Sequence, residues 1–362
     1  MKKRIIIGIF LTTAVFFLYL FFTGRFAPPN PLPTKTLSSY KLPEKIDRSP
    51  KAQAQAARDF LSLLDEHMRE QTQFPLDSPE RKKWTNHPPK HSEKGARLGD
   101  LTQEQIEAGL HLLSTILSKE GFYRVRNVPL ADDHIVPEGK RYVGFGAEDF
   151  RLVIFGEPAE DSPWAVQFDG HHLAVNINIH GSQMSLSPSL IGTEPHQFHL
   201  DGEVIRPIKA FTDKAYALIQ SLAGEQKKKA IISETSEDTQ LAEPEFDGFI
   251  PDLQGIKGAE LSSSHKAQLL GLIAEYVRSL PEHAAQVRIQ QLKAEIDEIH
   301  FSWCGPTTEK SAVSYRIQGP SLIIEYACQL FVPERPFDHI HTIYRDPSNE
   351  YGHRFMNPST RD

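Results

Sequence analysis

Cysteine is scarce in this sequence, which has two, Cys304 and Cys328, in 362 residues. They form no C-x-x-C pair, so the spacing of cysteine-based zinc and redox motifs is missing. Both cysteines lie in segments that read as neighbouring strands. Two expectations therefore stay open, a disulfide formed in an oxidising compartment or a pair of buried apolar thiols.

Common catalytic signatures are also missing. The sequence has no P-loop, no H-E-x-x-H and no G-x-S-x-G, and Gly144-Phe145-Gly146 lacks the third glycine of a dinucleotide-binding loop. A surplus of basic residues is missing as well, because the formal net charge is -7 and the pI is about 6.2. Without a basic surface, nucleic acid is not an expected partner.

The long apolar run of this sequence lies at its N-terminus. Basic residues at positions 2–4 precede the eighteen predominantly apolar residues 5–22, which nearly suffice to cross a bilayer as a helix. The run ends in Phe21 and Phe22, where a signal peptidase needs small residues. Residues 1–25 are therefore predicted to be a cytoplasmic stub and an uncleaved signal-anchor, with a cleaved signal peptide as the alternative.

This topology places the rest of the chain outside the cytoplasm, in the periplasm or its equivalent, with the lipid bilayer as a partner through residues 5–22. Residues 26–50 hold six prolines and are predicted to form an extended linker. Residues 51–362 show neither an internal repeat nor a clear break in composition. They are predicted to form a single extracytoplasmic α+β domain.

The spacing of apolar residues predicts both helices and strands in this domain. Helices are expected over residues 51–70, 102–120, 208–222, 262–280 and 282–298, with an irregular surface loop over 71–100. Strands are expected as a meander from about residue 141, with Asp169-Gly170 as a hairpin turn, and as a C-terminal sheet over 299–304, 313–318, 321–326 and 339–344. The predicted fold class is thus α+β, with antiparallel strands packed against amphipathic helices behind a transmembrane helix.

A pair of histidines on the last predicted strand is the sharpest chemical feature. Residues two apart on a strand share a face, so His339 and His341 project together, with Arg345 further along the same face. Two imidazoles in this arrangement can hold one divalent ion. Arg345 is then a candidate for binding an anionic group of a substrate.

A second pair, His171 and His172, follows the predicted turn between two strands of the meander. On the second of these strands His172, Asn176 and Asn178 point to one side. This polar row is either a solvated face of the sheet or the lining of a cleft.

Glu325 is the third candidate, because it interrupts an otherwise apolar strand. A buried carboxylate is costly unless it is paired or bound to a metal. In a hairpin centred on Gly319-Pro320, Glu325 is expected opposite Ser314 and diagonal to Arg316. An ion pair with Arg316 and a role in a metal site are both compatible with this position.

The chain resembles an uncharacterised family, the "domain of unknown function 3500" family. The segments that carry the resemblance are Trp164 to Leu173 (WAVQFDGHHL), Pro188 to Pro195 (PSLIGTEP), Phe301 to Gly305 (FSWCG), Tyr315 to Tyr326 (YRIQGPSLIIEY) and His339 to Gly352 (HIHTIYRDPSNEYG). The resemblance implies family membership without an assigned activity. Where the family has E-Y-D-N, this chain has Glu325-Tyr326-Ala327-Cys328, and the N-terminal anchor is not part of the family pattern.

Three hypotheses follow for the function. The first is a metal-dependent enzyme in which His339 and His341, with His171 or His172 and Glu325, hold a divalent ion such as Zn, Fe or Cu. The second is a non-catalytic binding or scaffolding module tethered to the membrane. The third, a metal-free enzyme with His and Glu as acid and base, has no supporting spacing. The first requires the hairpin near residue 170 and the C-terminal strand to be neighbours.

Overall fold

The computed structural model describes residues 30–88, 94–136, 142–329 and 335–356. The predicted signal-anchor, residues 1–25, lies outside these ranges. Among the described helices, none has both the length and the apolar character needed to cross a membrane.

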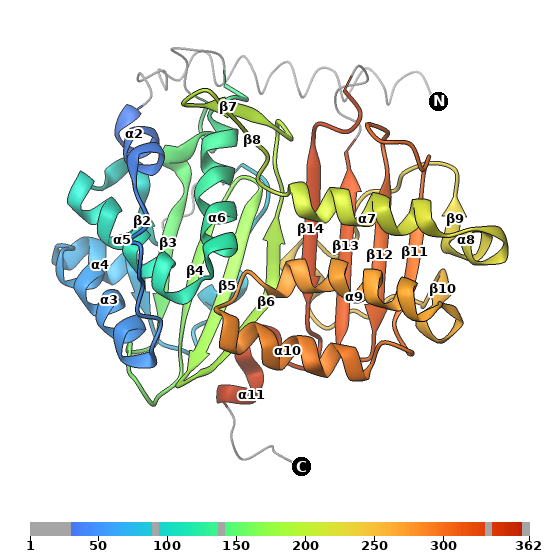
Figure 1. The fold of residues 1–362 in the computed structure, drawn as a ribbon. Helices are drawn as coiled ribbons and strands as arrows, with labels where there is room; N and C mark the ends of the chain where they lie inside the picture. Colours follow the sequence, from blue (N-terminus) through green and yellow to red (C-terminus); the bar gives the residue numbers. More distant parts are fainter. Residues whose placement is uncertain (1–29, 89–93, 137–141, 330–334, 357–362) are drawn as a thin grey trace, which may run out of the picture.

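One large mixed sheet runs through the molecule (Figure 1). Its first meander consists of β3 (Arg151–Phe155), β4 (Trp164–Gly170), β5 (Leu173–His180) and β6 (Gln183–Ile191). Its second consists of β11 (His300–Cys304), β12 (Ser314–Gly319), β13 (Leu322–Cys328) and β14 (Ile340–Arg345). The two meanders join at the centre of the sheet, where β6 pairs antiparallel with β14. The predicted α+β class and its antiparallel strands are confirmed.

Short strands and helices precede each meander in the same order. Before the first come α3 (Pro50–Ser62), α4 (Glu66–Thr72), β1 (Gln73–Phe74), β2 (Ala96–Arg97), α5 (Gln103–Ile116) and α6 (Lys119–Asp132). Before the second come α7 (Lys209–Ser221), α8 (Gly224–Ala230), β9 (Ile231–Ser233), β10 (Ile256–Lys257), α9 (Ser263–Val277) and α10 (Glu282–Ala294). Between the halves lies a small hairpin of β7 (Phe198–Leu200) and β8 (Glu203–Ile205).

The structure therefore contains an internal repeat. No repeat was found in the sequence, so this feature was not predicted. The strand register repeats with an offset of 149 residues. Leu152 pairs with Phe168 in the first half, and Phe301 pairs with Ile317 in the second. The edge strands repeat the same pairing without this offset, since β1 pairs parallel with β3 and β9 pairs parallel with β11.

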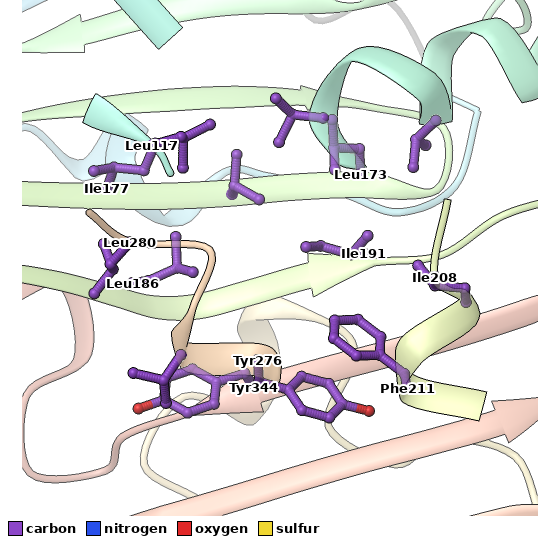
Figure 2. Packing of buried hydrophobic residues seen from close by; sticks show 14 of the residues in the cluster. Leu117, Leu173, Ile177, Leu186, Ile191, Ile208, Phe211, Tyr276, Leu280 and Tyr344 are labelled. Carbon is purple, nitrogen blue, oxygen red and sulfur yellow. The ribbon is translucent and has the colours of Figure 1, made fainter. Parts of the chain in front are cut away.

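The main core lies between the sheet and a layer of helices on one of its faces, in which α7, α9 and α10 cover the second meander (Figure 1). Figure 2 shows part of this core, where the ring of Phe211 lies near Ile191 of β6. Phe211 of α7 stacks on Tyr276 of α9 with ring centroids 4.0 Å apart. This apolar layer fixes which face of each strand is turned away from the helices.

Part of the predicted linker is helical and packed. Residues 31–39 form α2 (Pro31–Ser39), which begins with an Asn30 cap and a proline in its first turn. Leu37 of this helix is buried in the main core. The expectation of an extended, unpacked segment is therefore wrong for these residues.

The first predicted hairpin turn differs from its observed position. Asp169 and Gly170 belong to β4, and the turn residues are His171 and His172, the latter with a positive φ of 65°. Phe150 packs so closely that a Cβ atom on Gly170 would lie 2.7 Å from its ring. Packing of the strand end therefore overrides the Asp-Gly turn signal.

The cysteines are both free and buried. Cys304 pairs with Ser314, and Ser314 pairs with Ala327, so these three side chains share one face of the sheet. Cys328 follows Ala327 and points to the opposite face. Of the two expectations, the pair of buried thiols is the one observed.

Candidate metal centre

Three histidines from two distant segments meet on the face of the sheet that is turned away from the helices. His172 comes from the turn between β4 and β5, and His341 from the beginning of β14 with His339 just before it. Pairing of β6 with both β5 and β14 brings these segments together. The neighbourhood that the sequence-based metal hypothesis required is thus present.

The Nε2 atoms of the three rings converge on one point. Nε2 of His339 lies 2.7 Å from Nε2 of His172 and 3.0 Å from Nε2 of His341. An imidazole nitrogen carries either one proton or one lone pair, so Nε2 of His339 cannot serve both contacts as ordinary hydrogen bonds. A cation among the three nitrogens would satisfy all of them at once.

The three rings are buried and are held in the neutral form that binds metals. Burial lowers the pKa of His339 to about 4, and the neighbouring His171 acts in the same direction. Burial also lowers the pKa values of His172 and His341 well below 6.5, again with help from the adjacent imidazoles. Near neutral pH no proton therefore competes strongly for the ring nitrogens.

The outer nitrogens of two of these rings face carboxylates. Nδ1 of His339 lies 3.6 Å from Oε2 of Glu194, and Nδ1 of His172 lies 3.7 Å from Oδ1 of Asp132. Within the described ranges, Nδ1 of His341 has no hydrogen-bond partner. Both distances exceed the length of a hydrogen bond, so neither carboxylate orients its ring by a direct hydrogen bond.

His171 lies beside this cluster and not within it. Its ring packs against that of His172 with centroids 3.7 Å apart and a tilt of 31°, and its Nδ1 lies 2.6 Å from Oδ1 of Asp132. Consecutive strand residues would point to opposite faces, but the two-residue turn lets both rings lie on the same side. Asp132, His171 and His172 form a second group with the atoms needed to hold a metal.

Gly192 lies so close to the histidine cluster that a side chain at this position would clash with its neighbours. A Cβ atom at this position would lie 2.6 Å from the carbonyl oxygen of Ile340 and 3.1 Å from the ring of His341. Its N–H donates to the carbonyl oxygen of His172 at 2.7 Å. The glycine thus joins the turn to the beginning of β14 at the closest approach of the two segments.

The structure does not bring Glu325 into either histidine group. Its carboxylate accepts hydrogen bonds from Nε of Arg316 and from the backbone N–H groups of Gln240 and Leu241. Arg316 lies directly opposite Glu325 and Ser314 opposite Ala327, so the expected register is wrong by two residues. The ion pair with Arg316 is confirmed.

Arg345 is buried and fully engaged. Its guanidinium binds the carboxylates of Asp247 and Glu350 and the carbonyl oxygens of Leu241 and Glu243. These contacts hold loops over the face of the sheet that carries the histidines. Arg345 therefore stabilises those loops, and the donors in these contacts bind the protein and not a ligand.

The polar row along β5 is buried. Asn176 receives a hydrogen bond from Gln167, and Asn178 receives one from Arg81. Arg81, from the segment that was expected to be an irregular surface loop, also accepts a hydrogen bond from Gln167 at its carbonyl oxygen. The solvated-face interpretation is therefore wrong.

Sequence reasoning missed Asp132, Glu194 and Gly192. Asp132 ends α6, a helix that was not predicted from the sequence, so no pattern indicated a role for this residue beside the sheet. Glu194 lies in the segment PSLIGTEP that carries the family resemblance, and this segment contains Gly192 as well. The family resemblance of this segment was the sequence feature that could have indicated Gly192 and Glu194.

The turn that carries His171 and His172 has an equivalent in the second half of the repeat, and that turn holds no histidine. The turn equivalent to His171-His172 is Pro320-Ser321, between β12 and β13. The hydroxyl of Ser321 donates to the carboxylate of Glu295, and it accepts a hydrogen bond from Arg288. The histidine cluster therefore combines the turn of the first meander with the beginning of β14 in the second meander, where the two halves of the repeat pair through β6 and β14.

Comparison with known families finds one family that matches most of the chain. The family described as "Protein of unknown function (DUF3500)" matches residues 47–353. The chain matches no curated protein and no solved structure. The matched region spans both halves of the repeat and every residue of the histidine cluster, which confirms the resemblance seen in the sequence.

Proposed function

Because the chain belongs to the DUF3500 family, whose description names no activity, we propose a function from the geometry of its site. The protein is a metal-dependent enzyme whose ion is bound by Nε2 of His172, His339 and His341. The observation that carries this proposal is the convergence of three buried imidazole nitrogens on a single point.

The spacing of the nitrogens suits a zinc-sized ion. Zn–N bonds of about 2.0–2.1 Å in a tetrahedral site place the nitrogens about 3.3 Å apart. The observed separations of 2.7 and 3.0 Å need only small side-chain movements to reach that value. Imidazole ligands also suit copper, iron and nickel, so the ligand type alone favours a borderline transition metal.

Three protein ligands favour a catalytic site over a structural one. Structural zinc sites have four protein ligands, whereas catalytic sites have three and leave a position open for water or substrate. Such an ion supplies Lewis acidity for hydrolysis of esters, amides or phosphoesters. Glu194 lies next to His339 with a partly exposed side chain, and we propose it as the residue that contacts a substrate.

We propose further that the domain works outside the cytoplasm, tethered by residues 5–22. The support is the apolar run behind three basic residues and the bulky residues at its end. Protease added to intact cells is expected to degrade the folded part. If the bulk of the chain survives this treatment, the proposed location is wrong.

The metal is tested first. Full-length protein in detergent is treated with a chelator, reloaded with zinc, separated from free metal and analysed by mass spectrometry. We expect at least one ion per chain, and we expect His339→Ala and His341→Ala to lower the zinc affinity by 100-fold or more, on the order of 3 kcal/mol. His111→Ala, which removes an exposed histidine on α5, is the control.

The catalytic part of the proposal needs a separate test. Zinc-loaded and metal-free proteins are assayed with chromogenic esters, phosphoesters and peptide anilides. Hydrolysis that appears with zinc and is lost in His341→Ala supports the enzyme. A protein that binds zinc and cleaves none of these probes is instead the binding module of the second hypothesis.

A further inference from the structure

We propose that this centre holds two divalent ions, with the imidazole of His172 bridging them. The inference rests on the function proposed above and deepens it. The first ion is bound by Nε2 of His172 together with His339 and His341. The second is bound by Nδ1 of His172 together with Asp132 and His171.

The second group of ligands is compact and buried. Oδ1 of Asp132 lies 2.6 Å from Nδ1 of His171 and 3.7 Å from Nδ1 of His172. Metal–ligand bonds of about 2.0–2.2 Å place ligand atoms about 3.3 Å apart, between these two distances. Two imidazoles and one carboxylate form a mixed ligand set that zinc and related metals accept.

His172 provides the independent observation. Its side chain is 1 % exposed, and its Nδ1 is buried without a hydrogen-bond partner among the described residues. This nitrogen points toward Asp132, but 3.7 Å is too long for a hydrogen bond. A carboxylate that served only to orient His172 would lie within about 3.2 Å of it.

Asp132 is fixed in a position to act as a ligand. Its other oxygen, Oδ2, accepts the backbone N–H of Gly146 at 2.6 Å. This contact holds the carboxylate at the end of α6, with Oδ1 turned toward the two histidines. The neighbouring Asp133 makes different contacts, to the N–H of Ala147 and the hydroxyl of Thr34.

The bridge has a defined proton balance. Neutral imidazole has one N–H, and both nitrogens of His172 become ligands when the two ions are bound. The ring proton therefore leaves to solvent, and the resulting anion lies between two dications. Asp132 adds a second negative charge, which favours retention of both ions.

Metal stoichiometry tests the inference. Chelator-treated full-length protein is titrated with zinc alone, passed over a desalting column and analysed by mass spectrometry. We expect two ions per chain in the wild type and one in both Asp132→Asn and His341→Ala. The amide that replaces the Asp132 carboxylate keeps an oxygen that can accept from Gly146, so the fold is expected to survive, and circular dichroism checks this point.

Asp133→Asn is the matched control, because it changes the adjacent carboxylate outside the cluster, and it is expected to retain two ions. One ion in the wild type overturns the second site and leaves the proposed function intact. An absence of bound zinc overturns both. Two ions in folded Asp132→Asn show that the second ligand set is wrongly assigned.

A copper-loaded sample distinguishes the bridge from two separate sites. Two Cu(II) ions joined by one imidazole couple magnetically. The electron paramagnetic resonance signal of the doubly loaded wild type is therefore expected to integrate to well below two spins per chain. A full signal from two bound copper ions contradicts the bridge.

Discussion

At the scale of single residues, the chemistry of the site depends on histidines that the fold keeps neutral. His339 and His341 were recognisable from their spacing on a strand, and His172 from its place beside a turn. The contact between these histidines could not be predicted, because no local sequence pattern indicates which distant strands become neighbours. The strand pairing that joins them exists only in the folded sheet.

The neutral histidines make the metal-free protein sensitive to acid. The pKa of His339 falls from 6.5 to about 4 on folding, so between these values the unfolded chain binds a proton that the folded chain does not. The free energy of unfolding is therefore expected to fall as the pH is lowered through this window, by up to about 1.4 kcal/mol per pH unit. His172 and His341 act in the same direction.

Urea unfolding of chelator-treated protein across this pH range measures the effect. His339→Gln lacks the titrating ring and is expected to show a shallower dependence. A dependence as steep as that of the wild type in this variant would contradict the assignment.

Glu325 is expected to matter for stability and not for metal binding. Glu325→Ala leaves Arg316 and two backbone N–H groups without their acceptor. Loss of one partner from a largely buried pair costs about 3–5 kcal/mol of the free energy of unfolding. Denaturant titration measures this loss. Zinc stoichiometry in the same variant should remain that of the wild type, and a lower value would make Glu325 a candidate ligand again.

At the scale of elements, packing decides where turns fall. The Asp169-Gly170 pair has the sequence of a turn, yet Gly170 is needed under Phe150 at the end of β4. The turn moves to His171-His172, and this shift places two imidazoles side by side. A local rule thus fails at the position that carries the proposed chemistry.

Gly192 tests how tightly the elements around the centre are packed. Gly192→Ala introduces a Cβ atom 2.6 Å from the backbone oxygen of Ile340, so the turn and β14 must separate. We expect a loss of about 1–3 kcal/mol of stability and weaker zinc binding. Thermal unfolding and zinc titration measure the two effects.

Gly271 of α9 offers a matched control, since nothing lies within 4 Å of a Cβ atom there. Gly271→Ala is expected to raise stability by about 0.5–1 kcal/mol, because alanine favours the helix. Equal behaviour of the two variants would show that Gly192 is not a close-approach position.

At the scale of the whole molecule, the fold is a duplicated unit of helices and a four-stranded meander. The repeat escaped sequence inspection because few residues are shared between the halves. Gly170 and Leu173 correspond to Gly319 and Leu322 at equivalent turns. The pairing of strands is preserved between the halves where the side chains differ, so the repeat could not be predicted from the sequence. The individual helices and strands were largely predictable, because each depends on its own pattern of apolar residues.

Arg124 joins the two halves. This buried residue of α6 contacts the side chain and the carbonyl oxygen of Glu275 in α9, and the hydroxyl of Ser279. Arg124→Ala removes one partner of a buried pair and is expected to lower the free energy of unfolding by about 3–5 kcal/mol. Urea denaturation measures this free energy of unfolding. Lys119→Ala, which changes an exposed residue of the same helix, is the control and is expected to change the free energy of unfolding by no more than about 0.5 kcal/mol. A loss of less than about 1 kcal/mol for Arg124→Ala would show that the halves do not depend on this contact.

The central claim is that three histidines bind a metal ion, and anomalous diffraction tests it most directly. Crystals of the zinc-loaded protein are measured on both sides of the zinc absorption edge. We predict an anomalous peak at about 2.0–2.1 Å from Nε2 of His172, His339 and His341. A zinc-saturated crystal without a peak among these three nitrogens would contradict the account.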